Sequence, residues 1–343
     1  MMKKLFYIGL IAVVLLSCSK DDIPENNEMG TLIEFGELKT RTVEDVSDIL
    51  EFGVFAEVNR GDNNSGMLEA SQYSDLLFNE RVYRANASSS WTYDSKRYWF
   101  KDRTFRFFAL YPYQNKNWVR HATLTQNGEE YDGYQIAFEI PTDPNTGLAN
   151  ANTDLLTASR TVITEENQTS FETVNFTFRH VLSQINIKVA KNAINATNKV
   201  VVTSVSLGGI WKTGTLNTSH VSSEYKDNWD FSGATTASLS ANGSWTLTTS
   251  GTEVMNSLLL MPQTIALQRI PVTISYQYYN NEADLTPQVT ATAQAFIPVG
   301  EWEPAKIYTY TIVLAAQDNT IKIPTPAVSS WGAYQSGGTI IIQ

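Results

Sequence analysis

The sequence predicts an all-β fold made of β-sandwich modules. Apolar and polar residues alternate along several short segments, most clearly in Val272–Tyr278, so the apolar side chains would share one face of a strand. Clusters of Asn, Gly, Asp, Ser and Thr separate these segments, as in Asn59–Gly66. No segment has a sustained helical stripe of apolar residues. Short strands divided by turn clusters are typical of β-sandwich domains.

The expected strands are spread along the chain after residue 50. They are Phe52–Glu57, Arg106–Tyr111, Tyr134–Ile140, Val174–Phe178, Ile185–Val189, Val200–Leu207, Leu258–Met261, Val272–Tyr278, Thr290–Ile297 and Tyr308–Leu314. Two further segments, Gln72–Phe78 and Asp154–Ser159, are predicted to form single helical turns. Pro112 should end the strand before it, because proline cannot continue a central ladder.

A dense group of aromatic residues is expected to form much of the core of the N-terminal half, since each ring buries a large area. A ligand-binding platform is the alternative, but a cluster beside a strand favours a core. The group comprises Trp91, Tyr93, Tyr98, Trp99, Phe105, Phe107 and Phe108.

The length of 343 residues is sufficient for two ordinary domains. Two polar stretches, Asp143–Asn152 and Thr164–Thr173, favour a boundary near residue 172. The expected division is an N-terminal domain over residues 31–172 and a C-terminal domain over residues 173–343. The formal net charge of −10 argues against nucleic acid as a partner, because phosphates repel an acidic surface.

The N-terminus has the features of a secretory signal. Lys3 and Lys4 precede the apolar stretch Leu5–Leu16, which is too short to span a bilayer. Ser17 and Cys18 at its end resemble the bacterial lipoprotein box, which implies cleavage between them and a lipid on the Cys18 thiol. A plain signal peptide with an incidental thiol is the alternative. Residues 1–17 would then be removed, and the polar residues 18–30 would form a tether.

The residues after Cys18 suggest where the protein is displayed. Ser19–Asp22 resembles the short acidic signal that sends Bacteroidetes lipoproteins to the outside of the outer membrane. We therefore expect a surface-exposed protein that the lipid holds to the cell outer membrane.

Residues for enzyme or metal chemistry are sparse. The histidines, His121, His180 and His220, are far apart in sequence, and lipidation of Cys18 would leave no thiol. No His-x-x-x-His pair, glycine-rich phosphate loop or Gly-x-Ser-x-Gly elbow is present. Adjacent carboxylates such as Glu129–Glu130 would point to opposite faces of a strand and stay solvated. We predict no enzyme, no catalytic residues, no cofactor and no metal site, and we interpret His180 as a satisfied core or turn histidine.

A series of segments in order along nearly the whole chain after residue 30 resembles the fimbrillin superfamily of Bacteroidetes. The resemblance implies two tandem transthyretin-like (Greek-key) β-sandwich domains and assembly with other fimbrial subunits into a fimbria. The segments are Ile33–Phe35, Lys39–Thr42, Phe52–Ala56, Trp91–Tyr93, Arg97–Trp99, Phe105–Pro112, Asp154–Ala158, Val174–Ile185, Leu260–Gln263, Ile297–Gly300 and Tyr308–Tyr310.

The resemblance also implies how such a subunit assembles. In that family an arginine-specific protease removes an N-terminal segment with the first strand, and a neighbouring subunit's strand then fills the groove. Here the first strand would be Thr31–Leu38, with Ile33 and Phe35 pointing into the core. Cleavage would fall between Arg41 and Thr42, although Arg41 could also be an ordinary loop arginine.

The tail over residues 315–343 is the candidate for the free strand. Its last residues, Thr339, Ile340, Ile341 and Ile342, would form the donor strand. An apolar strand at a chain end must be covered, so the tail is either such a donor or the last strand of its own domain. The sequence leaves both open, together with a stalk or a tip position in the pilus.

Two alternative functions stay open at this point. The chain could be an uncleaved lipoprotein that anchors the base of the pilus, or a surface β-sandwich lipoprotein that binds glycans. An exposed row of rings would favour sugar binding, and burial of the same rings would favour the pilin; the rings are Trp211, Tyr225, Trp229 and Trp245. A host or bacterial surface ligand would be a further partner, and the sequence does not identify it.

Overall fold

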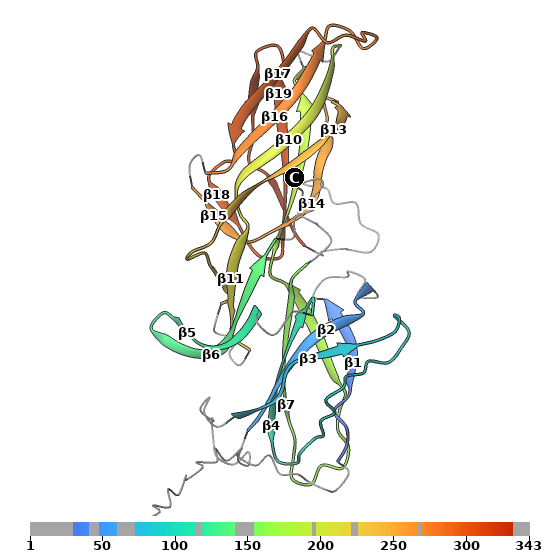
Figure 1. The fold of residues 1–343 in the computed structure, drawn as a ribbon, viewed down its shortest axis with the longest axis vertical. Coiled ribbons are helices and arrows are strands. Elements are labelled where there is room, and N and C mark those ends of the chain that lie inside the picture. The colour runs from blue at the N-terminus through green and yellow to red at the C-terminus, as the bar shows by residue number, and fades with distance from the viewer. Residues whose placement is uncertain are drawn as a thin grey trace, which may run out of the picture.

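The computed structural model describes residues 30–40, 48–59, 73–113, 118–140, 154–193, 197–220, 226–266 and 269–331. The regular elements named in these ranges are all β-strands, which confirms the all-β class. Figure 1 shows an elongated molecule, with the N-terminal strands at one end and the C-terminal strands at the other. Within the described ranges no helix is long and apolar enough to cross a membrane.

The N-terminal end contains a six-stranded sheet. Its order is β1-β8-β7-β4-β2-β3, so β1 and β3 are its edges, and β1 runs parallel to β8. The expected boundary at residue 172 precedes β8, whereas the chain leaves this sheet for the last time after β8. The strands are β1 (Phe35–Thr40), β2 (Glu51–Asn59), β3 (Tyr73–Tyr83), β4 (Thr104–Tyr111), β7 (Leu156–Ile163) and β8 (Val174–His180).

Both predicted helical turns are wrong. Tyr73–Phe78 lies in β3, which pairs antiparallel with β2, and Leu156–Ser159 lies in β7, between β4 and β8. The sequence pattern was ambiguous because the adjacent apolar residues Leu76 and Leu77 fit a helical turn as well as a strand. The ladder bonds with distant strands decide the conformation in each case.

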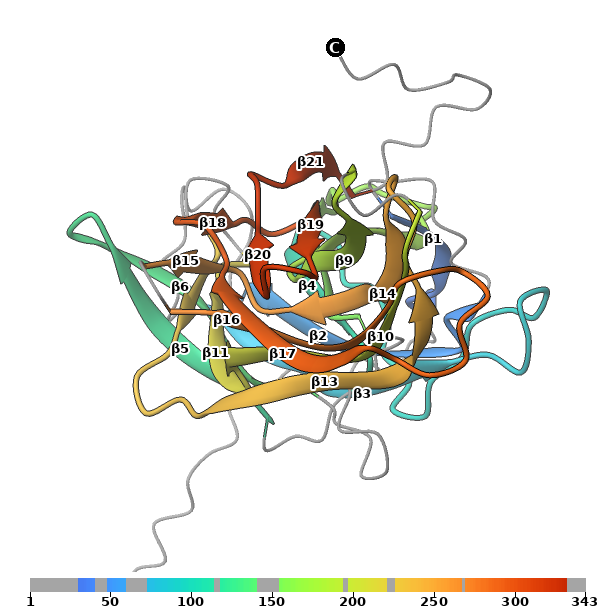
Figure 2. The ribbon, with the colours of Figure 1, turned by 90° about the horizontal axis from the view of Figure 1, so that it is seen from above.

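The C-terminal end is a sandwich of two sheets, which Figure 2 shows from above as two layers. One layer has the order β13-β10-β16-β17; the other has the order β14-β9-β19-β20, with β21 also paired to β19. A short two-stranded sheet, β15-β18, lies beside them. The strands are β9 (Ser183–Lys191), β10 (Lys199–Trp211), β13 (Thr236–Thr246), β14 (Thr252–Leu260), β15 (Gln263–Ile265), β16 (Pro271–Tyr279), β17 (Val289–Phe296), β18 (Gly300–Trp302), β19 (Lys306–Ala315), β20 (Thr320–Lys322) and β21 (Ala327–Ser330).

A fifth sheet joins the two ends of the molecule. Its order is β12-β11-β6-β5, and it pairs strands from both halves of the sequence: β5 (Val119–Gln126), β6 (Glu129–Glu139), β11 (Thr213–Thr218) and β12 (Asn228–Asp230). Tyr134 of β6 packs against Phe55 and Phe108 of the six-stranded sheet. This joining sheet therefore continues the C-terminal core onto one face of the N-terminal sheet.

The other face of the six-stranded sheet carries the aromatic core expected from the sequence. Tyr93, Trp99, Phe105 and Phe107 are buried there with β1, and Trp91 packs on them half-buried. Phe108 is also buried, but in the core shared with the joining sheet. The expectation is wrong for Tyr98, which is 45% exposed. Its neighbour Trp99 takes the inward position, because successive residues of an extended chain point to opposite faces.

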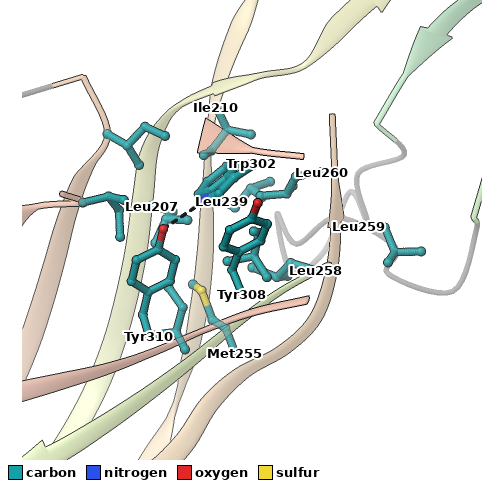
Figure 3. Packing of buried hydrophobic residues seen from close by; sticks show 14 of the residues in the cluster. Leu207, Ile210, Leu239, Met255, Leu258, Leu259, Leu260, Trp302, Tyr308 and Tyr310 are labelled. Carbon is teal, nitrogen blue, oxygen red and sulfur yellow. Dashed lines mark hydrogen bonds between the residues drawn. The ribbon is translucent and has the colours of Figure 1, made fainter. Parts of the chain in front are cut away.

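Trp302 is the largest fully buried side chain in the C-terminal core. Its indole Nε1 donates a hydrogen bond of 2.9 Å to the hydroxyl of Tyr310. Figure 3 shows this pair among leucine side chains of β10, β13 and β14. The hydrogen bond satisfies the indole N–H, which is what allows a tryptophan to be buried completely.

The same burial predicts a loss of stability at alkaline pH. Desolvation raises the pKa of Tyr310 to about 12. Because the folded state then holds its proton more tightly than the unfolded state, stability is full below about pH 10 and falls as the pH rises towards 12. We expect Tyr310→Phe to remove about 2 kcal/mol of the pH-dependent loss between pH 9 and pH 11.5, measured by urea unfolding. Tyr98→Phe, at an exposed position, is the control and should leave the wild-type pH dependence unchanged.

Candidate functional site

The segment that contains β1 is held between two parts of the N-terminal core. On one side the Ile33 N–H donates to Arg97 O at 2.9 Å, and the Trp99 N–H donates to Thr31 O at 3.0 Å. On the other side the Val174 N–H donates to Glu34 O at 2.8 Å, and β1 continues along β8. The expected strand Thr31–Leu38 is thus present as an extended segment, with the regular strand over Phe35–Thr40.

The inward side chains of this segment complete the aromatic core. Ile33 and Phe35 are buried, as predicted, and Leu38 is buried as well. The step from Phe35 to Leu38 spans three residues because the register with β8 shifts there. The Phe35 ring contacts four aromatic rings from other strands and loops, namely Phe52, Tyr93, Phe107 and Phe176.

Removal of this segment would therefore open a groove with a fixed chemical character. The floor would be the aromatic rings that Phe35 now covers, and one wall would be the free ladder groups of β8. The Tyr93 hydroxyl, which donates to Ile33 O at 2.9 Å, would also lose that acceptor. Such a groove can accept another extended chain through main-chain hydrogen bonds and alternate side chains.

The residues proposed for processing and lipid attachment lie outside the described residues. This holds for Ser17 and Cys18 and for Arg41 and Thr42, which follow β1 directly in sequence. The structure therefore describes the strand that would be removed and leaves the cleavage position a prediction.

The described part of the C-terminal tail belongs to its own sheet. β20 and β21 both pair antiparallel with β19, along different parts of that strand. Trp331 then anchors the chain. Its backbone N–H donates to Ala305 O at 2.9 Å, and its ring stacks on the His180 ring with the centroids 4.0 Å apart. Thr339, Ile340, Ile341 and Ile342 lie outside the described residues, so their role as a donor strand stays a prediction.

His180 confirms the interpretation of a satisfied core histidine. It is buried, its Nδ1 contacts the carboxylate of Asp154, and its ring is covered by Trp331.

The aromatic residues proposed as a sugar platform are used for packing. The Trp211 ring stacks on the Phe231 ring with the centroids 4.9 Å apart. It also lies under the guanidinium of Arg269, whose Cζ is 4.2 Å from the Trp211 ring centroid. Trp229 continues the stack onto Phe231 and donates its indole N–H to Val181 O. The three described tryptophans of the proposed row are all half-buried, and Tyr225 lies outside the described residues.

The ring of Trp245 is likewise covered by its own strand. A Cβ added at Gly243 would lie only 2.6 Å from the Trp245 ring, so the ring lies directly on that glycine.

A cavity of about 800 Å³ lies beside this stack. It is lined by both tryptophans of the stack and by Gln263, which is buried and whose amide Oε1 and Nε2 have no partner among the described residues. The lining of the cavity therefore contains a buried amide with no partner among the described residues, next to rings that are already stacked.

The family model described as fimbrillin-like matches residues 40–331. The chain belongs to the fimbrillin-like family. The family consists of structural fimbrial subunits and not of enzymes, so the predictions of the family and of a non-enzymatic role are confirmed.

Individual relatives of this fimbrillin-like chain agree with the family. It is 27% identical to the protein named Fimbrium subunit Fim1C from Phocaeicola vulgatus, over 92% of each chain. Its fold resembles the crystal structure of a fimbrial protein from Bacteroides vulgatus, with a TM-score of 0.62 and 21% identity over 88% of this chain and 99% of that one. It also resembles a proposed cell adhesion protein from Bacteroides ovatus, with a TM-score of 0.51 and 17% identity over 89% of this chain and 99% of that one.

The fimbrillin-like fold also brings together titratable residues that are far apart in the sequence. Glu57, on β2, contacts two histidines. Its Oε2 lies 3.0 Å from His220 Nε2, and its Oε1 lies 3.7 Å from His121 Nδ1. Asp132 lies close to Glu57 and His220, and Asp75 contacts His121.

One signal in the sequence could have revealed this group. Glu57 is the one charged residue in the otherwise apolar and buried run Phe52–Val58 of β2, and a buried carboxylate needs a partner.

Proposed function

We propose that this chain is a structural pilin-type subunit of a cell-surface fimbria, exported as a lipoprotein on Cys18 and assembled by strand exchange after cleavage behind Arg41. One observation carries this proposal: β1 is an edge strand that fills an aromatic groove and is followed at once by the arginine.

The energetics of β1 suit a segment that is held firmly and then replaced. Burying Ile33, Phe35 and Leu38 contributes about 1.5–3 kcal/mol for each side chain. While the peptide is intact, the segment is tethered to its groove and excludes a competing strand. After cleavage the segment must bind as a separate chain. Its binding is then weakened by the loss of translational and rotational entropy on association, which a tethered strand does not undergo.

The strand of a neighbouring subunit that replaces β1 would bind in the same groove. A strand with apolar side chains at alternate positions would restore both the ladder with β8 and the cover over the aromatic floor. Other subunits of the fimbria, identical or different, are therefore the proposed partners, and the naming of the Phocaeicola vulgatus relative as a fimbrium subunit supports this.

N-terminal sequencing of the protein shed from cells tests the proposal. We expect a chain that starts at Thr42, and we expect Arg41→Ala to leave an acylated Cys18 and to abolish polymer. Arg60→Ala is the matched control, because Arg60 also lies in a polar stretch of the sequence, beyond the segment proposed for removal. Wild-type protein that carries only an acylated Cys18 would show instead an uncleaved anchor at the pilus base.

A glycan-binding surface lipoprotein is the second candidate, and the free amide of Gln263 in the cavity favours it. The stacking of Trp211 between its own neighbours argues against it, because a sugar needs a free ring face. A glycan array with the purified chain distinguishes the two: specific binding that Gln263→Ala removes would support a lectin, and no binding would support the pilin.

A further inference from the structure

The residues around Glu57 form a cluster built from four separate strands and one loop. Glu57 comes from β2, Asp75 from β3, His121 from β5 and Asp132 from β6, and His220 follows β11. The cluster lies where the joining sheet packs on the six-stranded sheet, beside Tyr134.

The inner part of this cluster is withdrawn from solvent. Glu57 and His220 are each 5% exposed, and Asp132 is half-buried. One carboxylate oxygen of Asp132 lies within 4.8 Å of one of Glu57, so two acidic groups are held close together. In addition, the Nδ1 of His220 has no hydrogen-bond partner among the described residues. Two carboxylates are thus held close together beside a buried imidazole whose Nδ1 has no partner among the described residues.

Specific packing holds His220 in this place. The segment before it lies directly on Gly133: a Cβ there would meet Thr218 O at 2.4 Å and Ser219 Cα at 3.1 Å. The Ser219 hydroxyl donates to Asp132 O at 2.9 Å. The His220 ring also contacts the Tyr134 ring, with the centroids 4.6 Å apart. A glycine at position 133 is thus required for this close approach, and the imidazole is fixed before any ligand arrives.

We propose that Glu57, Asp132 and His220 bind one divalent transition-metal ion of the zinc type. One ligand atom from each residue lies within 4.8 Å of the others. Carboxylate oxygen and imidazole nitrogen are the usual zinc ligands at about 2.0–2.2 Å, which places tetrahedral ligands about 3.3–3.5 Å apart. His220 would bind the ion through Nε2, which now contacts Glu57 Oε2 directly at 3.0 Å, close to that spacing, while its Nδ1 points away from the ion. Three protein ligands would leave the fourth position to water.

The neighbouring residues His121 and Asp75 would support this ion from outside. His121 Nδ1 lies 3.7 Å from the second oxygen of Glu57, and His121 Nε2 lies 3.1 Å from Asp75 Oδ1. His121 and Asp75 are much more exposed than Glu57 and His220, which favours the inner group as the ion site. The ion would tie β2 of the six-stranded sheet to β6 and to the segment after β11, and so would fasten the joining sheet to the N-terminal end.

Metal titration of the purified full chain, first stripped with EDTA, tests the proposal. We expect one Zn²⁺ per chain by isothermal titration, and a Zn²⁺-dependent rise of the unfolding temperature. Bound Co²⁺ should give the visible absorption of a tetrahedral site. His220→Gln should weaken Zn²⁺ binding by about 100-fold or more. Mutating a residue that only contacts a metal ligand typically lowers the affinity by about 10–100-fold, and the loss of a ligand itself should lower it further.

Asp132→Asn and Asp75→Asn form the matched pair that locates the ion. The first should weaken Zn²⁺ binding about as strongly as His220→Gln, and it serves as the second variant if His220→Gln does not fold. The second should change the affinity by less than about tenfold. No saturable binding by the wild type, or binding that Asp75→Asn removes and Asp132→Asn leaves intact, would overturn the proposed site.

Discussion

Replacing Phe35 with alanine is expected to lower the free energy of unfolding of the uncleaved chain by about 3–5 kcal/mol. Phe35 is buried and contacts four aromatic rings, so the truncation leaves a cavity among rings that cannot collapse into it. Chemical denaturation of the lipid-free precursor, followed by tyrosine and tryptophan fluorescence, measures the change.

The proposed processing makes this effect temporary. Once the chain is cleaved behind Arg41, residue 35 is gone, and the mature product of Phe35→Ala is identical to that of the wild type. We therefore expect normal stability and normal polymer from the variant after processing.

Phe105→Ala is the control for this prediction. Phe105 lies in the same core but on β4, which stays in the mature chain. Its replacement should cost a similar amount before and after processing. A mature Phe35→Ala protein that is still destabilised would show that β1 is retained and that the proposed exchange is incorrect.

The strands that the sequence predicts best are those whose alternation is regular. Val272–Tyr278 lies within β16, and its apolar residues are buried while the polar ones between them are half-buried. This agreement arises because a sheet with one face on a core requires a period of two, and that period is visible locally. The two segments predicted to form helical turns lacked this period, and only their pairing with distant strands determined that they are strands.

The cluster around Glu57 shows a second kind of information that the sequence does not display. The expectation of no metal site depended on the wide spacing of the histidines, and His121 and His220 come within reach of one carboxylate only when β5, β6 and β11 form one sheet. Spacing along the chain identifies sites built on one helix or one loop. It misses sites assembled from several strands, for which a buried charge such as Glu57 is the better indicator.

The first inward residues of the segment that contains β1 could be predicted from the sequence alone, because they alternate regularly. Ile33 and Phe35 are separated by one residue, and this alternation places both on the buried face. The inward turn of Leu38 could not be predicted, because it depends on the register shift against β8.

The C-terminal residues are the other place where a large effect is expected. Replacing both Ile340 and Ile342 with asparagine should abolish polymer. In a strand these two side chains share one face, and a donor strand would place them in the pockets of the groove that β1 leaves. The loss of two buried isoleucines corresponds to about 3–6 kcal/mol of binding free energy. Sedimentation of the fimbriae sheared from cells measures the polymer.

Two control substitutions show whether the effect belongs to that face. Ile341→Asn changes the opposite face of the same strand and should reduce polymer much less. Val328→Asn changes an apolar residue of β21 that is 54% exposed and paired with the chain's own β19, so polymer and stability should both stay near wild type. If the double variant assembles as well as the wild type, Thr339–Ile342 are not the donor, and the groove must be filled by a different strand of the neighbouring subunit.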